Sequence, residues 1–383
     1  MAYNPLWSIG MDNDIFNLNF DLEQTQPDSG SGDDVFTEDP YWKVDSVQLR
    51  QFLQLASSFT WRVGRDLTSK SVSLGYNEGN LICRATDFDS YLEYKIQNLS
   101  DKPILNTLIF PTATLLKVAA ITSFFILKQS SEGIFILLFG KWIPLESVDL
   151  DSSQYINEDP IEEHGCFTIP DNMSQLYQIS SSAMIPKDRN IIFTPNLIQS
   201  TLLWSVIQIF IDSTLSLSWV LTSREALLLK AFKTSVSVGV TKSDLPRIVL
   251  SSPVCKLYFI HRIPESNVID IILPDNGIRV MKSGINDLVA MSDNLPNSLG
   301  KLLFKYDNNL MITYCSKVCD TEYTIPSTMI TNSPASLKES AIQCTMLKQV
   351  MKVFSSSILS LYWDDSSLYL KDEGVEARIL FEA

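Results

Sequence analysis

Two hydrophobic periods alternate along the chain from residue 43 to its end. Apolar residues at i, i+3, i+4 and i+7 indicate amphipathic helices, and the alternating apolar and polar residues that follow each of them indicate half-buried strands. The six predicted helical segments are VDSVQLRQFLQLASSF (44–59), PTATLLKVAAITSFF (111–125), PDNMSQLYQISSSAM (170–184), TKSDLPRIVLSS (241–252), KSGINDLVAMSDN (282–294) and QCTMLKQVMKVFSS (343–356). The pattern therefore predicts one unit, a helix followed by antiparallel strands, repeated along the chain.

The stretch GNLICRATDFDSYLEYKI (79–96) shows the strand pattern most clearly. It predicts a tight turn at YNEGN (76–80) and a kink at ATDFDS (85–90), where a strand passes from one pairing to the next. Asp87 and Asp89 are expected to satisfy free backbone N–H groups at this kink, as Asp side chains do in turns. A catalytic carboxylate pair is the alternative.

The six units are predicted to pair into three domains of an α+β fold, at 43–160, 165–281 and 282–383. The stretch DSSQYINEDPIEEHG (151–165) is the expected linker after the first domain. Residues 1–42 form a separate acidic tail, whose segment QPDSGSGDD (26–34) has a composition that is typical of disorder.

The net charge of −14 is concentrated in this tail. Residues 1–42 contain no basic residue and nine acidic ones: Asp12, Asp14, Asp21, Glu23, Asp28, Asp33, Asp34, Glu38 and Asp39. In the segment MDNDIFNLNFDLE (11–23), apolar residues are interleaved with acids, which suits docking into a groove. A solubilising tail with incidental aromatic residues is the alternative.

Several classes of protein fit the sequence poorly. No N-terminal leader is expected, since the first basic residue is Lys43, and the apolar run TLLWSVIQIFI (201–211) is too short to cross a bilayer. The two histidines, His164 and His261, are far apart in sequence, Cys315 and Cys319 are poorly spaced for a metal site, and no GxxxxGK[ST] motif occurs. We therefore expect a cytoplasmic protein, in a bacterium or an infected host cell, that is not an enzyme and uses no metal or cofactor.

Several stretches resemble the bacterial β sliding clamp family, the processivity subunit of DNA polymerase III. LRQFLQLASSF (49–59) followed by NEGNLICRATDFDSYLEYKI (77–96) is similar to the signature of that family's first domain. FIDSTLSLSWVLTSREALLLKAF (210–232) resembles its second domain, and LLFKYDNNLMITYCS (302–316) and LKQVMKVFSSSILSLYWDDSSLYLKDEGVEARILF (347–381) resemble its third. The resemblance covers residues 43–383 and suggests a divergent member of the family, encoded by a phage or other mobile element.

This resemblance implies a mechanism in which the protein catalyses no reaction. Three clamp-type domains per chain would close head to tail with a second chain, as a homodimer ring with helices inside and sheets outside. Double-stranded DNA would be held by topology, without sequence specificity, while the ring tethers a DNA polymerase and a separate clamp loader opens it. The alternatives are a clamp-like adaptor for a transcription or packaging factor and a β-rich virion structural protein.

The resemblance also implies that basic residues on the helices face DNA. The predicted DNA-facing residues are Arg50, Arg62, Arg65, Lys117, Lys187, Arg189, Lys242, Arg247, Lys282, Lys348 and Lys352. Contacts of this kind to phosphates are independent of sequence and sensitive to salt. The alternative is that these are ordinary surface residues of amphipathic helices.

A second implied site is a hydrophobic pocket that binds partner peptides. By position, Thr222 and Leu227 match one wall, and Ile379 and Phe381 match the C-terminal part. The chain has SREA (223–226) where the family usually has Asp-Gly-His-Arg, and it ends in LFEA instead of apolar-Pro-apolar-Arg-Leu. We expect changed selectivity, with ordinary core residues as the alternative, and the tail is a candidate to shield this pocket.

Overall fold

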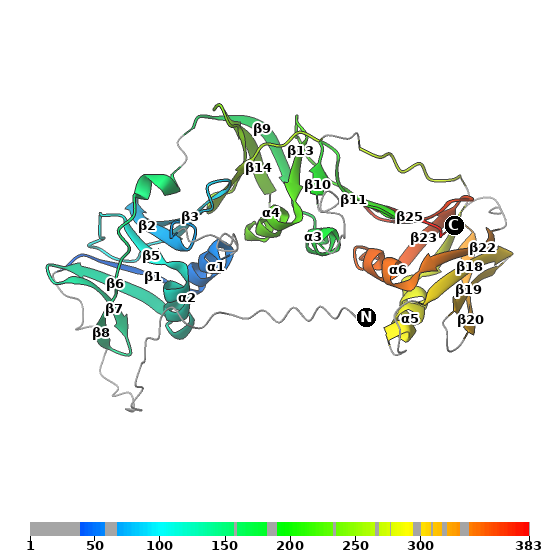
Figure 1. Ribbon diagram of the computed structural model, residues 1–383, viewed down its shortest axis with the longest axis horizontal. Coiled ribbons are helices and arrows are strands. Elements are labelled where there is room, and N and C mark those ends of the chain that lie inside the picture. The colour runs from blue at the N-terminus through cyan, green and yellow to red at the C-terminus, as the bar shows by residue number, and fades with distance from the viewer. Residues whose placement is uncertain are drawn as a thin grey trace, which may run out of the picture.

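The chain forms an arc with sheets along its convex side and helices along its concave side (Figure 1). The computed structural model describes residues 39–57, 67–156, 159–181, 190–232, 235–264, 268–275, 277–293, 300–307, 309–315, 320–329 and 337–382. Within these residues one unit recurs, a strand, a helix and three further strands, so the predicted helix-plus-strands repeat is confirmed with one additional leading strand.

We call the elements from β1 to β8, from β9 to β16 and from β17 to β25 the first, second and third segments. The first contains β1 (Tyr41–Asp45), α1 (Ser46–Ala56), β2 (Ser71–Asn77), β3 (Asn80–Thr86), β4 (Tyr91–Gln97), β5 (Leu108–Pro111), α2 (Thr112–Ile121), β6 (Phe124–Ser130), β7 (Gly133–Leu138) and β8 (Lys141–Pro144). A short 3-10 helix, η2 (Ser152–Tyr155), follows it.

The second segment contains β9 (Ile161–Thr168), α3 (Met173–Ser181), β10 (Asn190–Phe193), β11 (Leu197–Leu202), β12 (Ser205–Phe210), β13 (Trp219–Thr222), α4 (Ser223–Leu227), the 3-10 helix η4 (Leu228–Ala231), β14 (Ser235–Thr241), β15 (Arg247–Ser251) and β16 (Cys255–Ile260). The third contains β17 (Gly277–Met281), α5 (Lys282–Asp293), β18 (Lys301–Asp307), β19 (Asn309–Cys315), β20 (Asp320–Ile325), β21 (Ser327–Met329), β22 (Leu337–Gln343), α6 (Cys344–Met351), β23 (Ile358–Trp363), β24 (Ser367–Asp372) and β25 (Val375–Leu380).

Two of the sheets run across the boundaries between segments. The eight-stranded sheet has the order β5-β2-β3-β4-β16-β15-β14-β9, and its antiparallel β4–β16 pair joins the first segment to the second. The nine-stranded sheet has the order β13-β10-β11-β12-β25-β24-β23-β17-β21, and its β12–β25 pair joins the second segment to the third. The outer wall of the arc is therefore continuous through both junctions.

Two four-stranded sheets stand at the ends of the arc. Their orders are β1-β6-β7-β8 and β20-β19-β18-β22, so β8 and β20 are edge strands within the described residues. Edge strands carry unpaired backbone N–H and C=O groups that can pair with another chain.

The core lies between the sheets and the helices, which contact each other in pairs: α1 with α2, α3 with α4, and α5 with α6. In α1, the Asp45 side chain caps the helix by accepting from the Val47 N–H at 2.7 Å, and Leu49, Phe52 and Leu53 are fully buried. Full burial of one such side chain stabilises the fold by about 1.5–3 kcal/mol, so the apolar stripe of α1 fixes the helix on its sheet.

Five of the six predicted helices are confirmed, and the helix predicted at residues 241–252 is wrong. That stretch contains the end of β14, a turn and the strand β15. The helix that occupies the fourth position in the chain is α4, which precedes that stretch and was not among the six predicted helices. Pro246 and the β-branched Ile248 and Val249 favour the extended conformation that the structure shows.

The predicted kink at ATDFDS is a hairpin turn, because β4 folds back and pairs with β3 from Thr86 opposite Tyr91. The expected role of Asp87 is confirmed, since its carboxylate accepts from the Ser90 N–H at 2.8 Å. The tight turn predicted at YNEGN joins β2 to β3, with φ of 47° at Glu78 and 82° at Gly79.

The limits of the predicted domains stay a prediction, but two strands, β1 and β9, cross them, and β17 pairs outside its predicted domain. Trp42, placed in the tail, is fully buried in β1 and donates from its indole N–H to the Ile104 carbonyl at 2.9 Å. The strand β9 begins at Ile161, before the predicted start at residue 165. The strand β17, placed in the second domain, pairs with β23 of the third segment.

Candidate functional site on the concave surface

The helices of the concave side have a different charge balance from the rest of the chain. The six α-helices carry the basic residues Arg50, Lys117, Arg224, Lys282 and Lys348 and the acidic residues Glu225, Asp287 and Asp293. Glu225 is nearly buried and accepts a hydrogen bond from the Arg262 guanidinium at 2.6 Å, so its charge is compensated. In a chain with a net charge of −14, these helices are therefore a relatively basic surface.

Some predicted DNA-facing residues do lie on this surface. Lys117 in α2 and Lys352 at the end of α6 are exposed, and Lys348 in α6 is half-buried. Their contact with DNA stays a prediction. Four others lie outside the described residues: Arg62, Arg65, Lys187 and Arg189.

Two further predicted DNA-facing residues have structural partners. The Arg50 guanidinium in α1 donates to the Ala119 carbonyl near the end of α2 at 2.6 Å. The Lys282 ammonium at the start of α5 donates to the Phe354 carbonyl just after α6. A cation bonded to the carbonyl end of a helix satisfies an acceptor and favours the helix dipole. Both side chains thus hold the two helices of a pair together.

Lys242 and Arg247 do not lie on a helix, contrary to the prediction. Lys242 follows β14 and forms an exposed ion pair with Glu162 at 3.2 Å. In β15, Ile248 is fully buried in the core, and alternation along a strand puts Arg247 on the opposite face, over the Tyr91 ring at 5.0 Å. Arg247 therefore belongs to the outer face of the eight-stranded sheet.

One basic residue that the sequence prediction missed is Lys230 in η4. It is exposed, and no described residue forms an ion pair with it. A pocket of about 290 Å³ lies on one side of Lys230, and a second pocket of about 280 Å³ lies on the other. The signal that could have found Lys230 is the Thr222-x-x-Glu225 capping box, which starts the helical turns that carry it.

Two of the four predicted peptide-pocket residues, Thr222 and Ile379, lie far apart in the nine-stranded sheet. Thr222 and Ile379 lie on β13 and β25, with β10, β11 and β12 between them, which separates them by roughly 19 Å at ~4.8 Å per strand. Ile379 is fully buried, and Thr222 is the N-cap of α4, where its hydroxyl accepts from the Glu225 N–H at 3.2 Å. Leu227 and Phe381 are half-buried. Their role in binding a peptide stays a prediction.

An exposed apolar patch lies beside these residues. Leu203 and Trp204 form the turn between β11 and β12, and Leu203 is 73% exposed. The Leu380 N–H donates to the Trp204 carbonyl at 2.9 Å, and Leu380 is 40% exposed next to Phe381. Large apolar residues in a tight turn are the sequence signal that was missed, because turns ordinarily use Gly, Asn or Asp.

Among the described residues, no group of three or more His, Cys, Asp or Glu side chains is arranged to hold a metal ion. Burial, and to a smaller extent the His164 charge, lowers the pKa of His261, while a backbone hydrogen bond to Ser218 opposes the shift.

No helix among the described residues has the length and apolar character that a bilayer span requires.

Comparison with known proteins gives structural relatives only. No family model matches the sequence, and no curated protein matches it either. Among solved structures, the chain is similar to the sliding clamp (DNA polymerase III subunit beta) from Pseudomonas aeruginosa bound to griselimycin, with a TM-score of 0.72, 12% identity and coverage of 90% of this chain and 100% of that one.

Two further structures match over the same extent. The DNA polymerase III beta subunit from Thermotoga maritima has a TM-score of 0.70 and 11% identity, covering 90% of this chain and 99% of its own. The Helicobacter pylori beta clamp bound to DNA ligase peptide has a TM-score of 0.69 and 13% identity, covering 90% and 100%. The resemblance expected from the sequence is confirmed at the level of the fold, and the chain has the fold of the bacterial DNA polymerase III β sliding clamps.

Proposed function

We propose that this protein is a DNA sliding clamp: a ring of two copies that encircles duplex DNA and tethers a DNA polymerase without catalysing a reaction. The observation that carries the proposal is the charge on the concave side of the arc. The helices of an acidic chain carry more basic than acidic residues there, with Lys117 and Lys352 exposed. A basic inner surface attracts the phosphate backbone of any sequence, which suits a protein that moves along DNA.

The order of the strands supports closure of the ring. Each segment consists of two units. At the first junction, β4 is the last strand of the first unit in the first segment, and it pairs with β16, the last strand of the second unit in the second segment. At the second junction, β12 and β25 repeat this relation. The same step from the third segment would pair β20 with β8 of a second copy, and both are edge strands in the described chain.

We call the proposed pairing of β20 in one copy with β8 in the other the seam, and the backbone of β8 provides a specific test of it. The Leu145 N–H donates to Ile134 of β7 at 2.9 Å, so by antiparallel alternation the Trp142 N–H points to the open edge. Trp142→Pro removes that donor and keeps the β7 ladder, whereas the matched control Trp142→Val removes only the indole. Light scattering should give about 86 kDa, twice 43.2 kDa, for the parent and for Trp142→Val. A Trp142→Pro variant that remains dimeric would contradict this seam.

Retention on circular DNA tests the function itself. The protein is incubated with a nicked circle, with its loader where one is identified, and bound protein is followed by gel filtration in rising salt. We expect retention on the circle and release when one restriction cut makes the DNA linear. Equal retention on both forms would contradict topological binding and favour an adaptor that does not encircle DNA.

The tethering part of the proposal involves the apolar patch of Leu203, Trp204, Leu380 and Phe381, in which Leu203 and Leu380 are exposed and the two aromatic residues are half-buried. Burial of such side chains by a partner contributes about 1.5–3 kcal/mol each, and aromatic residues are frequent at the centres of interfaces. Leu203→Ser should therefore weaken the binding of a polymerase peptide, measured by calorimetry, without changing the mass of the ring. Unchanged affinity would exclude this patch as the tether.

A further inference from the structure

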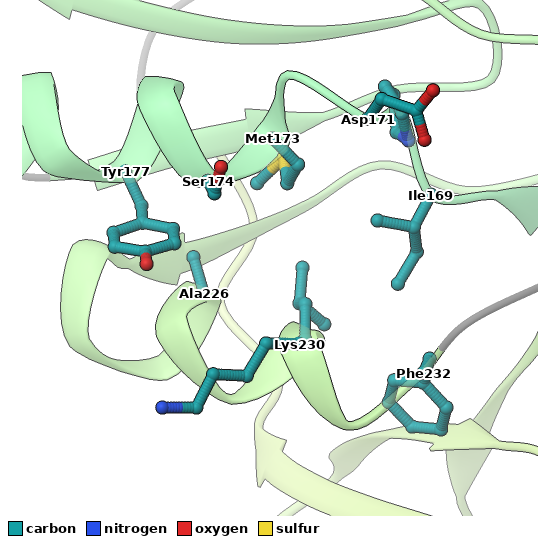
Figure 2. Close-up of a pocket in the computed structure, with 10 residues that line it drawn as sticks. Ile169, Asp171, Met173, Ser174, Tyr177, Ala226, Lys230 and Phe232 are labelled. Atoms are coloured by element: carbon teal, nitrogen blue, oxygen red, sulfur yellow. The ribbon is translucent and has the colours of Figure 1, made fainter.

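Two pockets share Lys230 on the concave side, one within the second segment and one between the second segment and α1 of the first, and we call them together the groove. The residues that line the first pocket include Ile169, Asp171, Met173, Tyr177, Lys230 and Phe232. In Figure 2 the side chains from α3 and the residues before it face those from α4 and η4 across this space. The second pocket is lined by Gln51, Gln54 and Leu55 of α1, Tyr94 of β4, Lys230 and Ala231. The groove therefore has a largely apolar floor, and Lys230 stands in its middle.

The first and third segments are closed at the equivalent place, where the first helix of the pair begins and the second ends. In the first segment, the Ser46 N–H donates to the Ser123 carbonyl at 3.2 Å, and the Ser46 and Thr122 hydroxyls are 2.9 Å apart. In the third, the Lys282 N–H donates to the Ser357 carbonyl at 2.8 Å. In the second segment, α4 has only five residues before η4, and the first pocket lies between the start of α3 and the end of η4. The position equivalent to Ser123 and Ser357 is residue 234, which lies outside the described residues.

We propose that the chain's own acidic segment, residues 12–23, docks in this groove and covers the concave surface. Charge favours this occupant: residues 1–42 contain nine acidic residues and no basic one, and Lys230, which lines both pockets, has no described ion-pair partner. Asp171 at the edge of the first pocket is the one acidic residue among the residues that line the two pockets. Of the helices that line the groove, α1 carries Arg50, α3 carries no charged residue, and α4 carries Arg224 and Glu225, whose charge is compensated by Arg262. The segment also supplies apolar side chains for the groove floor: Ile15, Phe16, Leu18, Phe20 and Leu22.

The covalent attachment of the segment favours docking on its own chain. The described chain starts at Asp39, β1 and α1 follow directly, and α1 itself lines the second pocket. Five residues of strand and eleven of helix span at most about 33 Å. Phe20 precedes Asp39 by 19 residues, which reach up to ~63 Å when extended. The tether is therefore long enough, with slack, to seat Phe20 in either pocket.

Site-specific photo-cross-linking of the full chain tests the docking. Phe20→p-benzoylphenylalanine places the reactive group on an apolar anchor, and mass spectrometry locates the cross-link. We expect cross-links within one chain to residues of the groove such as Met173, Tyr177 or Leu55. Cross-links to the patch around Trp204, cross-links that join two chains, or no specific cross-link would each overturn the proposal.

Two charge-reversal variants make a matched pair for this experiment. Lys230→Glu should lower the cross-link yield severalfold, because it places a negative charge in the groove opposite an acidic segment. Lys352→Glu, which changes an equally exposed lysine on α6 outside the groove, should leave the yield unchanged. An equal loss of yield in both variants would show that the segment follows general charge and not this groove.

A consequence for DNA rests on the proposed function. A tethered segment at millimolar effective concentration, with an intrinsic Kd of about 0.1 mM, would occupy the groove roughly 90% of the time and weaken a competitor about tenfold. The full-chain variant Phe16→Ser with Phe20→Ser should therefore bind duplex DNA about tenfold more tightly. Failure of the proposed function would appear separately, as equal retention of this variant on circular and linear DNA, whatever the cross-links show.

Discussion

The hydrogen bond between Arg50 and α2 leads to a prediction that separates structure from DNA contact. The guanidinium donates to the Ala119 carbonyl at 2.6 Å, in the last turn of α2, where carbonyls have no partner within the helix. A hydrogen bond from a charged group contributes about 1.5–3 kcal/mol, and the helix dipole adds about 0.3–1 kcal/mol. The Arg50 Nε atom is buried without a described partner, and this cost offsets part of the gain. We expect Arg50→Ala to lower the free energy of unfolding by about 1–2 kcal/mol.

Hydrogen exchange is the appropriate assay, because a chain of several segments need not unfold in one step. In Arg50→Ala, the peptide that covers the end of α2 should exchange faster, and the urea midpoint should fall. Lys117→Ala is the matched control, because it removes one exposed charge from the same helix pair. It should leave exchange unchanged and reduce the slope of log affinity against log salt by about 0.9, the value for one phosphate contact. The reasoning is refuted if Arg50→Ala leaves exchange unchanged and lowers the salt slope as Lys117→Ala does.

Three further predictions concern local features. Phe139 has a φ of 50° and is exposed, so Phe139→Gly should relieve backbone strain and raise the free energy of unfolding by up to about 1 kcal/mol, measured by thermal unfolding. Phe139→Ala keeps the strain and should show no gain. An equal gain in both variants would exclude strain as the cause. Hydrogen bonding to Lys301 lowers the pKa of Glu382. The carboxylate therefore contributes stability that is complete above its unfolded pKa and is lost as the pH falls through its folded pKa. The difference in the free energy of unfolding between the parent and Glu382→Gln should vanish in acid, and a difference that persists there would contradict the pairing. Burial raises the pKa of the Cys255 thiol to about 12, so alkylation should label the half-buried Cys166 in the native protein and Cys255 only after unfolding.

The repeated architecture was predictable from the sequence, because both hydrophobic periods recur six times. The misplaced fourth helix shows the limit of periodicity. The stretch TKSDLPRIVLSS has cap-type residues and apolar spacing but folds as a turn and a strand, while SREALLLKA (223–231) resembles a buried strand but forms α4 and η4. Capping information was present at Thr222 and Glu225, whose side chains and backbones bond reciprocally in a capping box.

The roles of the basic residues were less predictable, because they depend on contacts between residues far apart in sequence. Arg50 and its acceptor are 69 residues apart, and Lys282 and its acceptor are 72 apart. No local pattern distinguishes these two cations from Lys117, which is exposed on α2. The apolar patch at Leu203 likewise depends on the approach of the C-terminal strand to a distant turn.

The two strand ladders that join the segments have a consequence for how this fold diverges. Each joint is built from main-chain N–H and C=O groups, which every residue except proline provides. Substitutions that keep an extended backbone therefore leave the joint in place, and selection acts only weakly on the identity of its residues. A lineage can then exchange nearly all side chains of the outer wall while the curvature of the arc persists. A fold shared at a TM-score of 0.72 with 12% identity is what such tolerance would permit.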